Sequence, residues 1–135
     1  MTTMQAAAAA VEPAGYIAAK LEYETTPLEL EQVLEHVPNQ VFVVDIRSPA
    51  EFASGHIPTA RNIEVENLSA AYDDLPRNIP LVIYCGDGSC GFSLRATFEL
   101  AGAGFRVKRL LGGMESWRLN GYPVEATPPP ADLEY

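Results

Sequence analysis

Short runs of β-branched and aromatic residues predict the strands of this chain. Residues 41–44 and 81–84 are continuous apolar segments, without the alternation of a half-exposed strand. Such runs are typical of strands that are buried on both faces of a parallel sheet. A further strand is predicted over 106–111, where Gly112 and Gly113 end it.

Helix signals alternate with these strands. Thr26 can cap a helix, Pro27 suits its first turn, and Glu29 can complete a capping box. Two further helices are predicted over about 91–101 and 114–119. Alternating strands and helices predict an α/β fold, an open parallel sheet with right-handed crossovers and helices on both faces.

The two ends of the chain have a different character. Residues 17–25 alternate apolar and polar positions, which predicts an edge strand or an extended lead-in. Residues 1–15 are alanine-rich, and residues 126–135 contain three consecutive prolines, so both segments are expected to be flexible tails. A single domain over 16–125 is predicted between them.

Charge and hydropathy narrow the classes of partner. The net charge of −9 repels phosphate backbones and anionic lipid headgroups, so neither nucleic acid nor a membrane is an expected partner. No apolar run approaches the roughly 20 residues of a membrane span. The N-terminus lacks the positive charge of a secretory signal, which favours the cytoplasm. No dinucleotide fingerprint follows the first strand, and no cofactor is expected.

The basic residues gather toward the C-terminal half. This half can therefore receive a small anion, although scattered solvated charges are the alternative and the more common case. The residues concerned are Arg95, Arg106, Lys108, Arg109 and Arg118.

The loop after Cys85 has the composition of an anion site. Cys85 ends the apolar run 81–84, and open parallel sheets bind ligands beyond the carboxyl ends of their strands. Glycines let backbone N–H groups turn inward, and the next helix adds its positive end. The predicted cradle comprises Gly86, Asp87, Gly88, Ser89, Cys90 and Gly91. It would stabilise a thiolate, so Cys85 is a candidate nucleophile; the alternative is a small apolar residue at a strand end.

Cys90 has two open interpretations. Its separation from Cys85 across a curved loop allows the two sulfurs to reach disulfide distance, or it packs inertly in the first turn of the helix. Without a secretory signal, a framework of structural disulfides is not expected. Two cysteines alone cannot supply the four ligands of a zinc site, so no metal is expected.

Three separated motifs resemble those of the rhodanese-like family, and the likeness covers nearly the whole chain. The first begins at Asp45-x-Arg47 and continues to Gly-His-Ile-Pro at 55–58. The second is the Ile-Tyr-Cys sequence that ends at Cys85, and the third is Leu-Gly-Gly-Met-Glu-Ser-Trp at 111–117. The resemblance implies the rhodanese-like α/β fold, with Cys85 delivered by its strand.

The resemblance also implies a sulfurtransferase. The Cys85 thiolate would take the outer sulfur of a donor (thiosulfate, a persulfide or a polysulfide) and pass it from a Cys85 persulfide to a thiol or protein acceptor. Asp45, Arg47 and His56 would support the structure rather than react. As a hypothesis, Cys90 attacks the persulfide, releases sulfide and leaves a disulfide for a thiol reductant to open.

The loop departs from the commonest family pattern at Cys90. Many members have a basic residue at this place, five positions after the cysteine, and the chain instead resembles a subgroup with a cysteine-x4-cysteine loop. Without that charge, Asp87 would repel an anionic donor. Arg95 or Arg109 can supply the missing positive charge. Arg95 also follows Cys90 at the family spacing, but Cys85 is favoured as nucleophile because the buried strand ends there.

Two rival functions remain open from the sequence. The same fold hosts phosphatases and arsenate reductases, whose loops usually carry an arginine that this loop lacks. The domain can also be a non-catalytic protein-binding module, since a fold does not by itself fix an activity.

Overall fold

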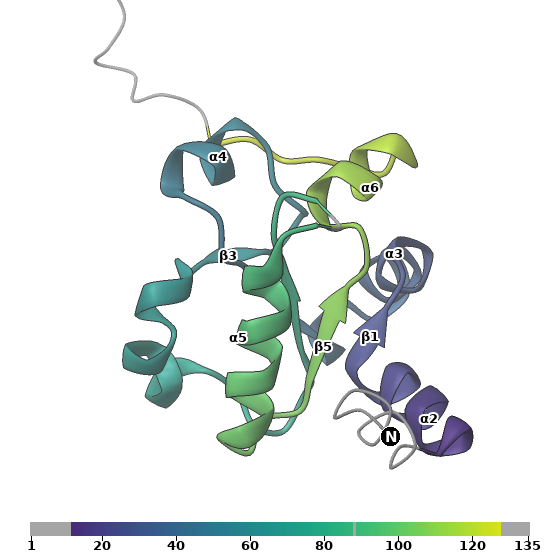
Figure 1. The fold of residues 1–135 in the computed structure, drawn as a ribbon. Coiled ribbons are helices and arrows are strands. Elements are labelled where there is room, and N and C mark those ends of the chain that lie inside the picture. The colour runs from purple at the N-terminus through teal and green to yellow at the C-terminus, as the bar shows by residue number, and fades with distance from the viewer. Residues whose placement is uncertain (1–11, 88, 128–135) are drawn as a thin grey trace, which may run out of the picture.

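The computed structural model of the chain describes residues 12–87 and 89–127 (Figure 1). Five strands form a sheet in the order β1-β5-β4-β2-β3, and every neighbouring pair is parallel. The strands are β1 (Glu24–Thr25), β2 (Phe42–Asp45), β3 (Arg61–Asn62), β4 (Leu81–Tyr84) and β5 (Val107–Leu110). This is the parallel α/β sheet that the sequence predicted.

Helices cover both faces of the sheet. The α-helices are α2 (Pro13–Tyr23), α3 (Pro27–His36), α4 (Pro49–Ser54), α5 (Gly91–Gly102) and α6 (Gly113–Leu119). Three 3-10 segments join them, η1 (Pro38–Gln40), η2 (Val65–Asn67) and η3 (Ser69–Asp74). Figure 1 shows α5 crossing one face of the sheet beside β5, while α3 lies behind it. The predicted helices are confirmed with their ends within a residue or two.

Alternate residues of the central strands pack into two separate hydrophobic cores, one on each face of the sheet. On one face, Val44 and Ile83 pack with Leu68, which lies between η2 and η3, and with Leu100 of α5. On the other face, the core of Val82, Tyr84 and their neighbours packs against Leu30, Met114 and Trp117 of α3 and α6. A strand buried on both faces needs no polar alternation, which explains the continuous apolar runs.

The carboxyl ends of β2 and β4 lie side by side. Asp45 is in register with Tyr84, so the segments that follow, beginning at Ile46 and Cys85, leave the same edge of the sheet. The Ile46 N–H donates to the Tyr84 carbonyl oxygen at 3.1 Å and extends this pairing by one residue. The topology therefore brings the Asp45-x-Arg47 motif next to the cysteine loop.

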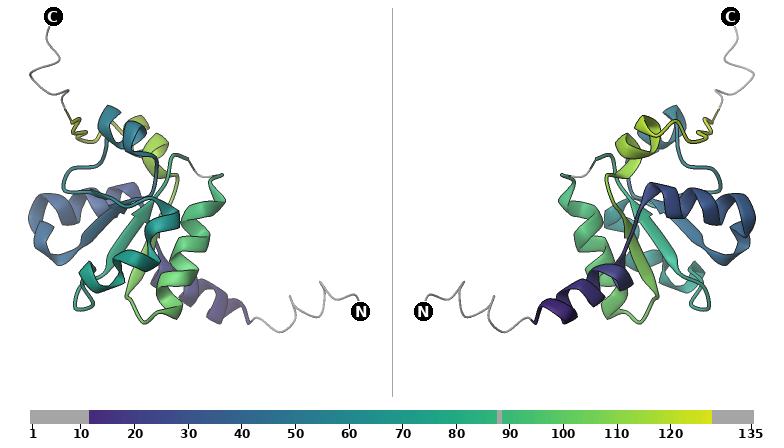
Figure 2. Two further views of the ribbon diagram at one scale, coloured as in Figure 1. Left: turned by 90° about the vertical axis from the view of Figure 1, so that its left-hand side faces the viewer. Right: turned by 90° about the vertical axis from the view of Figure 1, so that its right-hand side faces the viewer.

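The predicted strand over 17–25 is wrong for most of its length. Only Glu24 and Thr25 pair, with Arg109 and Leu110 of β5, and the preceding residues form α2. Pro13 at the first turn and several alanines favour the helix. No residue of α2 is buried, and Figure 2 shows this helix projecting from the edge of the domain. All of its residues are exposed, so no buried face imposes a helical spacing on its apolar positions.

The predicted tails fall mostly outside the described residues. Residues 13–15 belong to α2 rather than to a tail. At the other end, the Thr127 N–H donates to the carbonyl oxygen of Ala53 at 3.1 Å, which holds this residue against α4. The remaining parts, 1–11 and 128–135, lie outside the described residues.

Candidate active-site loop

The N-terminus of α6 holds the loop that follows β4. The N–H groups of Met114 and Glu115 donate to the carbonyl oxygens of Cys85 and Gly86, at 2.9 and 2.8 Å. Gly113 permits this approach, because a Cβ there would lie 2.5 Å from the Cys85 carbonyl oxygen. Its φ of +58° is also a left-handed conformation that side chains disfavour. The predicted loop is thus fixed by a helix distant in sequence.

The two cysteines are joined by a disulfide. Their Cα atoms are 6.4 Å apart, and the five-residue separation closes a short loop between the end of β4 and the N-cap of α5. Both cysteines are half-buried. Two interpretations were left open for Cys90. The bond agrees with the one in which the sulfurs of Cys85 and Cys90 reach disulfide distance.

Asp87 organises the backbone between the cysteines. Its carboxylate accepts hydrogen bonds from the Ser89 N–H at 2.9 Å and the Ser89 hydroxyl at 2.7 Å. The Cys90 N–H donates to the Asp87 carbonyl oxygen at 3.3 Å. The Ser89 hydrogen bonds lower the pKa of Asp87, which is therefore a carboxylate at neutral pH. Two N–H groups predicted to face an anion are thus directed at Asp87; Gly88 lies outside the described residues.

A pocket of about 500 Å³ opens beside the cysteines. Three acidic residues line it, Glu51, Glu66 and Asp87, together with the apolar side chains of Ile46, Val65 and Phe92. Arg47 is the one basic side chain among the lining residues of the described chain. The pocket therefore combines the two sulfurs with a largely acidic and apolar wall.

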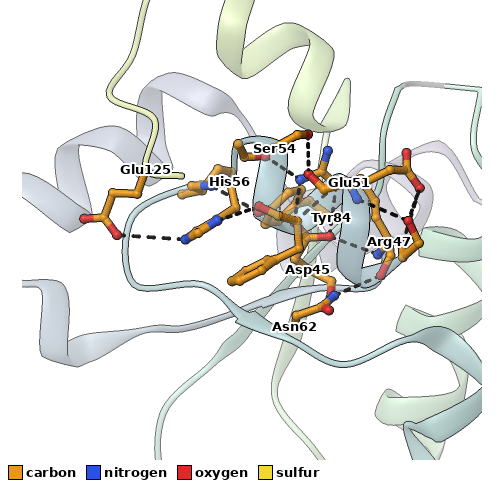
Figure 3. Close-up of polar contacts among 12 residues, drawn as sticks. Asp45, Arg47, Glu51, Ser54, His56, Asn62, Tyr84 and Glu125 are labelled. Atoms are coloured by element: carbon orange, nitrogen blue, oxygen red, sulfur yellow. Dashed lines mark hydrogen bonds and ion pairs between the residues drawn. The ribbon is translucent and has the colours of Figure 1, made fainter. Parts of the chain in front are cut away.

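The positive charge of Arg47 is already neutralised. Its guanidinium donates to both carboxylate oxygens of Asp45, with a shortest contact of 2.7 Å, and to the Gly55 carbonyl oxygen at 2.7 Å. The side chain of Asp45 is fully buried and that of Arg47 is 7% exposed. Burial alone would lower the pKa of Arg47, but the hydrogen bond and the charge of Asp45 outweigh it and raise this pKa. Figure 3 shows the polar contacts of Asp45 and Arg47.

His56 and Tyr84 fix the segment after α4 (Figure 3). The His56 Nδ1 lies 2.8 Å from the Phe52 carbonyl oxygen, and its Nε2 lies 3.9 Å from a carboxylate oxygen of Glu125. The Tyr84 hydroxyl accepts a hydrogen bond from the Ile57 N–H at 3.1 Å. Burial and the nearby charge of Asp45 raise the pKa of Tyr84, which stays protonated. These contacts connect strand ends and loops, and neither side chain lines the cysteine pocket.

The two arginines expected near the loop lie elsewhere. Arg109 on β5 forms an ion pair with Glu24 of β1, with an N–O distance of 2.8 Å. Arg95 is exposed on α5 and lines a neighbouring groove rather than the cysteine pocket. The arrangement therefore gives no support to the hypothesis that either residue supplies positive charge to Cys85.

Sequence reasoning missed several residues of the pocket. Glu51 had a local signal, because it forms a capping box with Ser48 at the start of α4. Glu66 and Phe92 had none, since they meet only when η2 packs beside α5. Tyr84 was identified as a buried strand residue, but its hydroxyl contact with Ile57 depends on the tertiary structure.

Neither a membrane-spanning helix nor a metal-binding cluster is found among the described residues. Among residues 12–87 and 89–127, no helix is long and apolar enough to span a bilayer. Within the same residues, no three His, Cys, Asp or Glu side chains gather as they would around a metal ion.

Comparison with known proteins identifies the family. The model of the rhodanese-like domain matches residues 26–120. This chain belongs to the rhodanese-like domain family. The match includes the whole sheet except β1, together with the cysteine loop and α6.

Rhodanese-like relatives include both enzymes and parts of larger proteins. The thiosulfate sulfurtransferase GlpE of Ectopseudomonas mendocina is 38% identical over 70% of this chain and 85% of its own length. An HTH-type transcriptional regulator of Mycobacterium tuberculosis is also 38% identical, over 67% of this chain, but the match spans only 40% of that regulator. A crystal structure from Bacillus halodurans has a TM-score of 0.76 at 32% identity, covering 83% of this chain and 82% of that one.

Proposed function

We propose that this rhodanese-like domain is a sulfurtransferase that carries sulfur as a persulfide on Cys85. The observation that supports it most is the place of Cys85, at the carboxyl end of the central strand β4 and open to a pocket. Likeness to sulfurtransferases such as GlpE supports the same reaction class. In the first step, the Cys85 thiolate attacks the outer sulfur of a donor persulfide, and the donor leaves as a thiol. The bond within the donor breaks as the Cys85 persulfide forms.

Cys90 then serves as the resolving thiol. Its thiolate attacks the Cys85 sulfur of the persulfide, forming the Cys85–Cys90 disulfide and releasing the outer sulfur as hydrogen sulfide. The electrons balance, because the persulfide sulfur is reduced to sulfide while the two cysteines are oxidised. The support for this step is that the structure joins the same two sulfurs. The enzyme then needs two electrons from a thiol reductant to begin another cycle.

The charge of the pocket favours donors that are not small anions. Glu51, Glu66 and Asp87 line it, and Arg47 is paired with Asp45. Like charges raise the free energy of an approaching thiosulfate, which carries two negative charges. We therefore assign a donor without a charge beside its reactive sulfur, namely a neutral persulfide or organic polysulfide, including one carried by a protein, ahead of thiosulfate.

The test is to measure sulfide released from protein that has been loaded with polysulfide and freed of excess donor. Without added thiol, the wild type should release one sulfide per chain as its disulfide closes. The Cys90→Ser variant should retain its sulfur until a dithiol is added, because it has no resolving thiol. The Cys85→Ser variant should carry no transferable sulfur.

Two outcomes would contradict the proposal. Equal spontaneous release from the wild type and Cys90→Ser would remove the resolving role of Cys90. Sulfur loaded equally on Cys85→Ser would remove Cys85 as the carrier, and the domain would then be better explained as a protein-binding module.

A further inference from the structure

A second groove lies along α5, next to the cysteine pocket. It encloses about 840 Å³ between η2 and α5, and its apolar lining includes Val65, Phe92, Leu94 and Phe98. Val65, Glu66 and Phe92 line both cavities. The groove therefore begins at the wall of the cysteine pocket and leads away from the disulfide along the helix.

The aromatic residues of this groove are more exposed than the fold requires. Phe98 is 83% exposed, and Phe92 is 54% exposed. The contact of α5 with the sheet is already provided by other residues of the helix, such as Leu100, which is fully buried. Exposed aromatic side chains beside a concave surface are typical of places where a protein partner binds. The groove is thus available to a partner without any change in the core.

The chemistry around the groove selects the kind of partner. The disulfide near one end of the groove can react by exchange with a thiolate, which attacks one of the two sulfurs along the line of the S–S bond. The acidic residues Glu51, Glu66 and Asp87 at that end disfavour small anionic thiols. A protein with a neutral or basic surface around its thiol meets no such repulsion, and an apolar side chain beside that thiol would fill the groove.

We propose that the groove lined by Val65, Phe92 and Phe98 is the docking site for a protein dithiol that reduces the Cys85–Cys90 disulfide. The proposal rests on the proposed function, in which that disulfide forms at each turnover. One thiolate of the partner attacks a sulfur of the disulfide, giving a mixed disulfide and one free cysteine thiolate. The second thiol of the partner then attacks the partner's first sulfur, which the mixed disulfide joins to this chain. Two electrons pass to this chain, and the partner leaves as a disulfide with both cysteines reduced.

The test compares a protein reductant with a small one. Oxidised wild type and Phe98→Ser are reduced by thioredoxin, used as the probe dithiol protein, and separately by dithiothreitol. Phe98→Ser should lower the second-order rate with thioredoxin about tenfold, as expected for loss of one aromatic anchor. The rate with dithiothreitol should be unchanged, because this small neutral dithiol needs no groove.

Leu119→Ser is the matched control, since Leu119 is 79% exposed and lies on α6 outside the groove. It should reduce at the wild-type rate with both reagents. The proposal is overturned if Phe98→Ser keeps the wild-type rate with thioredoxin, or if it loses rate equally with both reductants. It is also overturned if the wild type is a dimer that Phe98→Ser dissociates, because a second copy would then occupy the groove.

The assay separates this proposal from the sulfurtransferase reaction itself. Reduction of the disulfide is measured without any sulfur donor, so it does not depend on persulfide formation. Loading of Cys85 with polysulfide should be the same in Phe98→Ser and the wild type. A normal loading with a slower thioredoxin rate supports the groove, whereas absent loading in both proteins contradicts the proposed function alone.

Discussion

Asp87 sets the charge next to the two cysteines. Its carboxylate is held by Ser89 and lines the same pocket as Cys85. A neighbouring negative charge disfavours a thiolate, so Asp87→Asn should raise the alkylation rate of reduced Cys85 at neutral pH about threefold. Asparagine keeps an oxygen that can accept both Ser89 hydrogen bonds, which preserves the loop. The alkylation rate is measured at pH 7 in a Cys90→Ser background, and an unchanged rate would contradict this role.

Gly113 tests the packing of α6 against the loop. In Gly113→Ala, the new Cβ would press on the Cys85 carbonyl oxygen, and the left-handed backbone would be strained. We expect a loss of about 1–3 kcal/mol in the free energy of unfolding, together with slower persulfide formation. Gly121→Ala is the control, because Gly121 also has a positive φ but open space around it. If both variants lose equal stability and load sulfur normally, contact with the cysteine loop is not what requires Gly113.

The sequence predicted the position of Cys85 but not the direction of the N–H groups in the loop that follows it. A continuous apolar run ended at Cys85, and buried parallel strands deliver their last residues to the ligand edge. The direction of the loop N–H groups depended on Asp87, whose carboxylate accepts one of them. The predicted positive charge of Arg109 near Cys85 depended on the direction of its side chain. This side chain instead forms an ion pair with Glu24 of β1.

Among the elements, the strongly buried strands and the helix capped by Thr26 were predicted well, whereas the exposed edge and α4 were not. β2 and β4 are buried on both faces, and this environment imposes a continuous apolar pattern on their sequence. α2 lies outside the sheet without a buried residue, so its apolar positions carry little information about a helix. Its attachment to β5 depends instead on Lys108, whose Nζ donates to the Leu21 carbonyl oxygen, and on ion pairs made by Glu24.

These ion pairs predict how the α2–β1 edge responds to pH. The hydrogen bond from Lys20 and then that from Arg109 lower the pKa of Glu24, although burial opposes them. A pKa lowered by folding adds stability above the ordinary value of 4.5, and this stability is lost as the pH falls through the folded value. Glu24→Gln should therefore cost about 1 kcal/mol of unfolding free energy at pH 7, and less in acid.

The control for Glu24→Gln is Glu22→Gln, which removes the same charge from an exposed residue of α2. Urea unfolding at pH 7 and pH 3 would compare the two variants with the wild type. Equal stability of Glu24→Gln and the wild type at pH 7 would show that these ion pairs do not hold α2 and β1 to the sheet.

For the whole molecule, the order of motifs along the chain was enough to predict the family and its parallel sheet. The family model and the observed strand order confirm both. The groove along α5 was beyond sequence reasoning, because Val65 of η2 and Phe98 of α5 line it together only in the folded structure. The sequence predicted a helix over about 91–101 but did not separate its buried side chains from its exposed ones.

The net charge of −9 predicts a salt dependence of sulfur loading. Raising the ionic strength from about 0.01 M to about 0.5 M shortens the Debye length severalfold and screens the acidic pocket. The second-order rate of reduced protein with thiosulfate should then rise about threefold or more, whereas the rate with a neutral organic trisulfide should change little. A thiosulfate rate that falls with salt would indicate an attractive cationic site and contradict the acidic pocket.

The most direct test of the Cys85 persulfide is the intact mass of freshly reduced protein after incubation with polysulfide and removal of the donor under acid quench. The wild type and Cys90→Ser should each gain the mass of one sulfur atom, with the wild type converting to the disulfide form as sulfide leaves. Cys85→Ser should gain nothing. A sulfur adduct that persists in Cys85→Ser, or no adduct on any of the three proteins, would contradict sulfur transfer through Cys85.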